Sequence, residues 1–249
     1  MPRSSPRPAV RHRERQLGGP TRYGSNTSER EYSALGDQLS ALEQDIDGAR
    51  EASRRARQTP GLTFHPEHEE TMPSPHGEPV ALADGARILI RPIEPSDARQ
   101  LEAGFDHLGA VSRYRRFLAP IEHLSNTQLA YLTHVDHIAH EALLAIDTVT
   151  GEDVAVARFV RDPEDPRRAE VAIVVADHWQ GRGIGRMLAD RLRDRARSVG
   201  VESITARMLI GNRGARRLLD RVADEISESE DAGTIDIAAR LKPSRAPQS

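Results

Sequence analysis

The chain of 249 residues contains no cysteine and a single lysine, Lys242. Without cysteine, disulfides, thiolate metal sites and a covalent intermediate on a cysteine are all excluded. No run of 18 apolar residues is present, so no segment is predicted to span a membrane. The N-terminus lacks the apolar core of a secretory signal, and we therefore expect a cytoplasmic protein. The formal net charge of −3 gives no indication of nucleic-acid binding.

The first 83 residues differ in composition from the rest of the chain. Residues 1–27 hold proline, arginine, glycine and serine with few apolar side chains, and we expect a disordered arm. Residues 28–58 open with a capping box and place apolar residues at alternating steps of three and four, which predicts an amphipathic helix. This helix either lies on the rest of the chain or forms a short coiled coil that makes a homodimer. Residues 59–83 are rich in proline and are predicted to be a linker.

The segment 171–186 contains the most informative motif of the chain. Six consecutive apolar residues, 171–176, predict a strand that is covered on both faces. Glycines then occupy every second position from 181 to 185, and a helix is predicted to begin at Ile184. A glycine turn that exposes its N–H groups, followed by the positive end of a helix, can hold a phosphate or pyrophosphate.

The spacing of these glycines distinguishes the motif from two common phosphate-binding loops. No Gly-Lys-Ser/Thr follows, so the segment is not a P-loop. The third glycine of a dinucleotide-binding fingerprint would fall on Arg186 or Leu188, so that motif does not match either. A strand-to-helix turn without a ligand is the remaining alternative.

The elements around the motif are predicted from the period of their apolar residues and from turn and cap residues. The predicted strands lie at 86–93, 141–146, 154–160, 171–176 and 201–209, with two more around a turn at 231–233 within 225–241. The predicted helices begin at Pro95, at Ile184 (ending near Gly200) and after Asn212.

Two further segments complete a family resemblance. Gln180–Gly185 resembles the acyl-CoA-binding motif Gln/Arg-x-x-Gly-x-Gly/Ala of the GNAT superfamily of N-acetyltransferases. Arg91–Ile93 and Ser112–Leu118 resemble the opening of GNAT domains in bacterial protein-lysine acetyltransferases. The resemblance covers residues 84–241 and implies one α/β (α+β) domain, with a mixed, mostly antiparallel central sheet flanked by helices. Residues 242–249 are predicted to form a disordered tail.

This resemblance implies an enzyme that transfers an acetyl group directly from acetyl-CoA to an amine, with a protein lysine as the preferred acceptor. A small-molecule amine as acceptor, and an acyl-CoA-binding sensor or scaffold without turnover, are the alternatives. The implied partners are acetyl-CoA and the amine, with no metal, nucleic acid or membrane. With a single lysine, the chain offers almost no side-chain amine of its own to such a reaction.

The resemblance also implies how the donor is held. Backbone N–H groups of the glycine turn would face the pyrophosphate, and Arg182 or Arg186 would add positive charge. The pantetheine arm would pair with the edge of strand 171–176, and the N–H of Val174 or Val175 would stabilise the oxyanion. Asn212 would lie near the CoA arm, cap a helix, or do both. The predicted acetyl-CoA contacts are Val174, Val175, Gln180, Gly181, Arg182, Gly183, Ile184, Gly185, Arg186 and Asn212.

The candidate general base is Glu170, at the start of the strand, where related lysine acetyltransferases carry a catalytic glutamate. The alternative is a solvated carboxylate paired with Arg168 or Arg158. A tyrosine that often protonates the leaving thiolate in this family is replaced here by Leu219, and Val222-Ala223 replaces the Gly-Phe that commonly ends the same helix. Either the thiolate leaves unprotonated, which a thiol pKa near 8.5 permits, or another group donates the proton.

Three histidines, His134, His137 and His140, recur at intervals of three residues. On a helix this spacing would bring them together, as a zinc site requires. Because the segment leads directly into the strand at 141–146, we expect the three rings to be spread apart and predict no metal site.

Overall fold

The computed structural model of the protein describes residues 77–243. The predicted arm, the predicted helix at 28–58, residues 59–76 of the linker and residues 244–249 lie outside the described residues. Within residues 77–243 the structure contains no helix that is long and apolar enough to cross a membrane.

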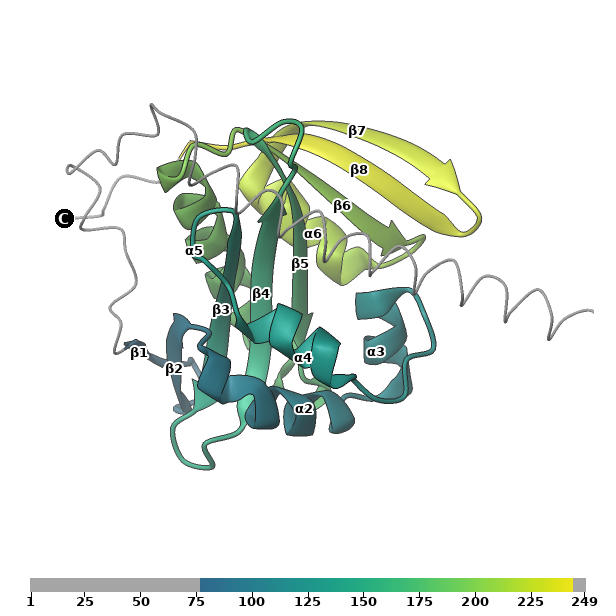
Figure 1. Cartoon of the computed structure of the whole chain (residues 1–249). Coiled ribbons are helices and arrows are strands. Elements are labelled where there is room, and N and C mark those ends of the chain that lie inside the picture. The colour runs from purple at the N-terminus through teal and green to yellow at the C-terminus, as the bar shows by residue number, and fades with distance from the viewer. Residues whose placement is uncertain (1–76, 244–249) are drawn as a thin grey trace, which may run out of the picture.

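The described chain forms one eight-stranded sheet with the order β1-β2-β3-β4-β5-β6-β8-β7 (Figure 1). Every neighbouring pair is antiparallel except β5 and β6, which are parallel. The strands are β1 (Glu78–Ala81), β2 (Arg87–Pro92), β3 (His140–Asp147), β4 (Asp153–Arg161), β5 (Arg168–Val175), β6 (Ser203–Leu209), β7 (Ala223–Asp231) and β8 (Thr234–Leu241). The predicted mixed, mostly antiparallel sheet is confirmed.

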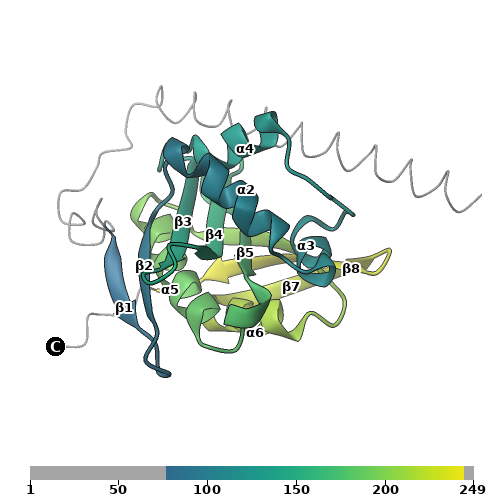
Figure 2. The same ribbon diagram turned by 90° about the horizontal axis from the view of Figure 1, so that it is seen from below.

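Helices cover both faces of this sheet, with α2 and α4 on one face and α5 and α6 on the other (Figure 2). The α-helices are α2 (Ala98–Asp106), α3 (Ala110–Phe117), α4 (Asn126–Thr133), α5 (Ile184–Ser198) and α6 (Arg213–Val222). Single 3-10 turns, η2 (Pro95–Asp97) and η3 (Asp177–Trp179), precede α2 and the glycine turn.

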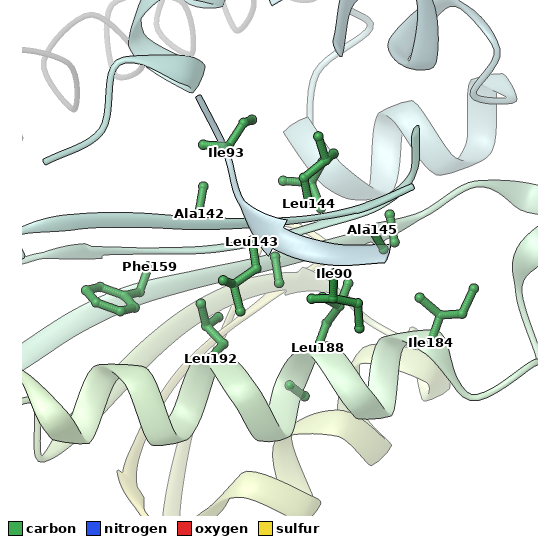
Figure 3. Packing of buried hydrophobic residues seen from close by; sticks show 14 of the residues in the cluster. Ile90, Ile93, Ala142, Leu143, Leu144, Ala145, Phe159, Ile184, Leu188 and Leu192 are labelled. Carbon is green, nitrogen blue, oxygen red and sulfur yellow. The ribbon is translucent and has the colours of Figure 1, made fainter. Parts of the chain in front are cut away.

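The core between α5 and the sheet is built from alternating strand residues and one helix stripe. Leu188 and Leu192, one turn apart on α5, face Leu143 and Phe159 of the central strands (Figure 3). All four side chains are fully or almost fully buried, and each contributes about 1.5–3 kcal/mol of hydrophobic stabilisation. The helix therefore fixes where the glycine turn at its N-terminus lies.

The linker was predicted to extend over residues 59–83, but the structure has a strand, β1, at Glu78–Ala81 within that range. This short edge strand pairs with β2, with Val80 opposite Ile88 and Pro79 opposite Leu89. Proline is tolerated there because an edge strand has one side without ladder hydrogen bonds. The strand was not predicted because the segment 59–83 is rich in proline, a composition that is typical of a linker.

Candidate functional site

The central feature of the site is a gap between the two parallel strands. β5 and β6 pair only at their first residues, from Arg168 opposite Ser203 to Glu170 opposite Thr205. β4 pairs with β5 along nearly its whole length, from Ala169 to Val175. The second half of β5 thus has one edge that no strand of the described chain covers.

Alternation of hydrogen bonds decides which amides face this open edge. The Ala176 N–H donates to the Val154 carbonyl (2.9 Å), and the Arg168 carbonyl accepts from the Asp162 N–H (2.9 Å). Because residues of an antiparallel pair alternate in the direction of their N–H and C=O groups, the even-numbered residues of β5 point toward β4. The backbone N–H and C=O groups of the odd-numbered residues, Val171, Ile173 and Val175, therefore point into the gap. Of the two predicted oxyanion donors, Val175 has its N–H at the open edge, whereas the N–H of Val174 is directed at β4.

The glycine turn continues from this open edge. Gly181 and Gly183 have φ values of 77° and 89°, in the left-handed region that favours glycine, and Gly183 is the N-cap of α5. Gly185 serves a different purpose. A Cβ there would lie 3.3 Å from Leu218 Cδ1 and 3.6 Å from Val175 Cγ2, so the missing side chain lets α5, α6 and β5 approach closely.

A cavity of about 1490 Å³ extends along the gap, bounded by α3, β5, β6, the glycine turn and α6. It brings together the predicted contacts apart from Arg182. The lining includes Glu170, Val174, Val175, Gln180, Gly181, Gly183, Ile184, Gly185, Arg186 and Asn212. The side chain of Ile184 is 1% exposed and belongs to the core, so only its backbone can serve a ligand.

Arg182 does not line this cavity and already has partners in the fold. Its guanidinium lies 2.6 Å from the Asp84 carboxylate, in the turn between β1 and β2, and 4.0 Å above the ring of Trp179. The Asp84 hydrogen bond raises the pKa of Arg182 and lowers that of Asp84. The prediction left the cationic role to Arg182 or Arg186, and the structure favours Arg186, which is exposed and lines the cavity.

Gln180 holds the turn rather than pointing its amide freely into the cavity. Its Nε2 donates to the Val175 carbonyl (3.0 Å), to Asp177 Oδ1 (3.0 Å) and to Ser112 Oγ (3.2 Å). Asp177 also accepts from the Gly109 N–H at 2.8 Å and from the Ser112 hydroxyl. These four residues, Gly109, Ser112, Asp177 and Gln180, are called the Asp177 network below.

The second helix of the motif also carries a structural role. Asn212 is the N-cap of α6, and its side-chain oxygen accepts from the Ala215 N–H at 3.2 Å. It lines the cavity as well, so the cap and the predicted place near a ligand are compatible. Leu219 is buried on the same helix and brings no proton donor to the cavity.

Glu170 lies exposed on β5 and lines the cavity. The alternative partners named for it are engaged elsewhere: Arg168 pairs with Asp162 at 2.5 Å, and Arg158 donates to His140 and to the Leu132 carbonyl. Burial lowers the pKa of the Arg116 guanidinium of α3, and the negative charge of Glu170 opposes this shift. The Glu170 carboxylate and the partly buried Arg116 guanidinium therefore attract each other electrostatically.

The rings of the three histidines have separate hydrogen-bond partners. His134 ends α4 with its Nδ1 3.0 Å from the Ala130 carbonyl, and His137 Nδ1 lies 2.7 Å from Glu141. His140 is buried, and its Nε2 accepts from Arg158 at 3.0 Å. Burial and then Arg158 lower the pKa of His140 to about 3, so its ring stays neutral. Within residues 77–243 no cluster of three metal-ligating side chains is found.

The charge of the cavity is strongly positive. Eight arginines and two acids contribute to its lining. The arginines are Arg115, Arg116, Arg186, Arg193, Arg207, Arg213, Arg217 and Arg221, and the acids are Glu170 and Asp231. Three of the arginines, Arg193, Arg207 and Arg221, are paired with aspartates outside the lining. The remaining charge suits a ligand with several phosphates.

Sequence reasoning missed Asp177, Trp179 and Asp84 as supports of the glycine turn. Asp177 and Trp179 follow directly after the apolar strand, where polar and aromatic residues often shape a turn, so a local signal existed. No local signal pointed to Asp84, because it lies 98 residues from the arginine that it holds.

An open strand edge that runs into a glycine turn and a helix N-terminus defines a protein that binds an extended ligand carrying phosphate. The chain belongs to the GNAT acetyltransferase family: residues 87–223, more than half of its length, match the family described as "Acetyltransferase (GNAT) domain". The predicted family and fold are thereby confirmed.

Two curated proteins and one solved structure show how near the relatives are. The chain is similar to Acetyltransferase Pat of Mycolicibacterium smegmatis, with 34% identity over 157 residues, which are 63% of this chain and 46% of Pat. It is 30% identical over 140 residues to Acetyltransferase PA5475 of Pseudomonas aeruginosa, covering 55% of this chain and 75% of that protein. The GNAT domain of S. lividans PAT matches with a TM-score of 0.59 and 28% identity, over 68% of this chain and 99% of that domain. The chain spans about half the length of Pat.

Proposed function

We propose that this protein transfers an acetyl group from acetyl-CoA directly to an amine, and that the acceptor is a lysine of another protein. The observation that carries the proposal is the open edge of β5, which leads through the single turn η3 into the glycine turn. Membership of the GNAT family and similarity to the Pat acetyltransferase support it.

The donor would lie along the gap between β5 and β6. The amide of Val175, the open-edge residue of β5 nearest the glycine turn, would pair with the pantetheine arm, as a neighbouring strand would. The N–H groups of Gly181 and Gly183 and the N-terminus of α5 would receive the pyrophosphate, with Arg186 as the cation. This arrangement supports a long ligand whose phosphates sit at one end and whose thioester sits at the other.

The reacting groups follow from the same arrangement. In CoA the pantetheine arm separates the pyrophosphate from the thioester, so the thioester would lie farther from the glycine turn than Val175, toward Glu170. The N–H of Ile173 or Val171, which faces the open edge there, would stabilise the oxyanion as it develops, in place of the Val174 or Val175 expected from the sequence. A lysine amine has a pKa near 10, so a base must remove its proton, and Glu170 is the exposed carboxylate of the cavity on β5. Since Leu219 offers no proton, the thiolate of CoA would leave unprotonated or receive a proton from another group.

An amine that carries a negative group is the second candidate acceptor. A protein lysine would favour an open and acidic cavity, whereas eight arginines line this one. Arg115 and Arg116 lie on α3, on the opposite side of β5 from α5 and α6. A carboxylate or phosphate on a small amine, or an acidic residue beside an acceptor lysine, would complement them.

The test is calorimetric titration of the full chain with acetyl-CoA, followed by thiol release with three acceptors. The acceptors are a lysine peptide with acidic neighbours, one with neutral neighbours, and a panel of small amines. Release with either peptide supports the proposal, and release with small amines alone favours the second candidate. Binding without release favours an acyl-CoA sensor, and absence of binding contradicts all three.

The role of Glu170 is tested by Glu170→Gln. We expect a loss of thiol release of about 100-fold at neutral pH, because general base catalysis contributes 10²–10⁴-fold, with little change in acetyl-CoA affinity. Glu202→Gln is the matched control, since Glu202 is an exposed glutamate that does not line the cavity. Activity unchanged by Glu170→Gln would remove Glu170 from the mechanism.

A further inference from the structure

The Asp177 network joins three parts of the site that are far apart in the sequence. The Asp177 carboxylate accepts from the Gly109 N–H at 2.8 Å and from the Ser112 hydroxyl, both at the N-terminus of α3. It also accepts from Gln180 Nε2 at 3.0 Å, at the start of the glycine turn. One side chain thus binds both the donor side and the α3 side of the cavity.

Gln180 carries the connection on to β5. Its Nε2 lies 3.0 Å from the carbonyl of Val175, which faces the open edge. The N–H of the same residue is the proposed contact of the pantetheine arm. The end of β5 that would hold the pantetheine arm is therefore linked through Gln180 to Ser112 and Asp177.

The position of α3 depends strongly on these contacts. Ser112 is the one buried side chain of this helix, whereas Val111 and Tyr114 are 64% and 44% exposed. A Cβ on Gly109 would overlap with Asp177 Oδ2, so glycine allows the close approach. A negative charge beside the first turn of a helix is also favourable. Polar contacts at the N-terminus, together with Phe117 packed on Phe105 at the other end, hold α3 in place.

The helix positioned in this way forms one wall of the cavity. Arg115, Arg116 and Phe117 of α3 line it, and these three residues are called the acceptor wall. Arg116 lies within the electrostatic reach of Glu170. A shift of α3 would therefore change the surroundings of the candidate base and the space for the amine.

We propose that Asp177 is a positioning residue that fastens α3 to the glycine turn, so that binding of acetyl-CoA orders the acceptor wall. The proposal rests on the proposed function, since it takes acetyl-CoA as the ligand of the turn. Occupation of the turn restrains Gln180, Gln180 and Asp177 restrain Ser112, and Ser112 restrains α3. Donor binding and acceptor binding are then coupled, and each strengthens the other by the same factor.

Hydrogen exchange of the full chain, with and without acetyl-CoA, tests this coupling without knowledge of the acceptor. In the unsubstituted protein we expect acetyl-CoA to protect amides of the turn (180–186) and of α3 (109–117). Ser112→Ala and Asp177→Asn should keep the protection of the turn and lose that of α3. Ser125→Ala is the control, since Ser125 Oγ accepts from the Gln128 N–H at the start of α4, so this variant removes a hydroxyl at a helix N-terminus without contact to Asp177.

Kinetics with the acceptor found by thiol release provide a second readout. Loss of a hydrogen bond to a charged group costs enough to raise the acceptor KM about tenfold in Ser112→Ala, with the acetyl-CoA Kd changed by less than about threefold. Ser112→Thr, which keeps a hydroxyl, should restore most of the acceptor KM. Melting temperatures of all variants establish that they are folded.

The outcomes separate this proposal from the proposed function. If acetyl-CoA does not bind to the unsubstituted protein, the proposed function fails and the coupling fails with it. If acetyl-CoA binds and protects the turn but leaves α3 unchanged, only the coupling is overturned. Protection of α3 that persists in Ser112→Ala and Asp177→Asn, or that is equally lost in Ser125→Ala, overturns the role of Asp177.

Discussion

Glu141 of β3 and Arg195 of α5 form an ion pair in which the side chains are only 1% and 4% exposed. The guanidinium Nε lies 2.7 Å from the carboxylate, and Glu141 also binds His137. The hydrogen bond to Glu141 raises the pKa of the His137 imidazole. A buried carboxylate with these two partners ties the helix to the start of the strand.

Removal of one side chain of the Glu141–Arg195 ion pair should destabilise the folded protein. We expect Arg195→Ala to lower the free energy of unfolding by about 3 kcal/mol, because Glu141 would remain buried with less compensation. Urea unfolding of the full chain measures the change. Arg207→Ala is the matched control: the Arg207–Asp236 pair also joins a guanidinium directly to a carboxylate, but its side chains are 58% and 41% exposed, so the loss should stay below about 1 kcal/mol. Equal losses in both variants would contradict this account.

Asp153, at the start of β4, is a partly buried carboxyl group whose oxygens are shielded from water. Neither of its carboxylate oxygens has a hydrogen-bond partner among the described residues. Burial, and then the negative charge of Asp97, raise the pKa of Asp153 from 3.8 to about 7. As the pH rises from 3.8 to 7, the unfolded chain ionises while the folded protein keeps the proton. The free energy of unfolding therefore decreases across this interval, and the loss is complete above pH 7.

Asp153→Asn should remove this pH-dependent loss. The shift corresponds to at most about 4 kcal/mol, and remaining contact of the residue with water reduces it to about 2 kcal/mol. We expect the variant to gain this amount over the unsubstituted protein at about pH 8 and clearly less at about pH 5, measured by urea unfolding. Asp106→Asn, at a side chain that is 51% exposed, is the control and should show no such difference. A gain independent of pH would contradict the titration of Asp153.

At the scale of elements, the glycine turn and α5 depend on each other. Gly183 caps α5 with a φ of 89°, and no atom lies within 4 Å of the place where a Cβ would stand. Glycine is therefore required by the backbone angle and not by crowding. A different backbone angle would redirect the N–H groups that we assign to the pyrophosphate.

Gly183→Ala should consequently weaken acetyl-CoA binding by about tenfold, since an alanine in this region costs about 1 kcal/mol or more and shifts the turn. Calorimetric titration measures the change. Gly151→Ala is the matched control, because Gly151 also has a positive φ (74°) and open space, but lies in the turn between β3 and β4 outside the cavity. It should lose stability with unchanged affinity. Equal affinity in both variants would exclude the turn from donor binding.

The elements most clearly predicted from the sequence were those with strong local patterns. The strand predicted at 154–160 corresponds to β4 (Asp153–Arg161), and the helix predicted to begin at Ile184 does begin there. β1 was missed, because four residues with one proline give too little periodicity to be recognised. The gap between β5 and β6 was not visible either, since pairing depends on how two strands diverge in space.

In the whole molecule, Lys242 is the single lysine whose side chain could accept an acetyl group. The Lys242 ammonium donates to the Asp220 carbonyl at 2.5 Å and lies 3.3 Å from the Asp224 carboxylate. The predicted tail at 242–249 therefore begins with a residue that is held against α6 and β7. Its side-chain nitrogen is engaged by two acceptors of the fold, which hinders its attack on a thioester.

We expect Lys242 to remain unacetylated when the protein is incubated with acetyl-CoA. Peptide mapping by mass spectrometry measures its modification, with a lysine peptide in the same tube as the positive control. Rapid acetylation of Lys242 while the peptide stays unmodified would contradict the proposal of a separate acceptor.

The helix predicted at 28–58 is tested by the mass of the full chain in solution: a dimer that dissociates after deletion of these residues indicates the coiled coil, and a monomer indicates a helix that lies on the domain.

Local patterns in the sequence predicted most strands, α5 and the glycine turn, because these follow from periodicity and backbone preferences within a few residues, and the resemblance of three short motifs predicted the family. The tertiary structure decided which groups remain for a ligand. It directed the Val175 amide to the open edge, engaged Arg182 with Asp84, and placed Asp177 between α3 and the turn. Each of these depends on a partner that folding brings near from a distant part of the chain, and hydrogen bonds and ion pairs of that kind leave no local pattern in the sequence.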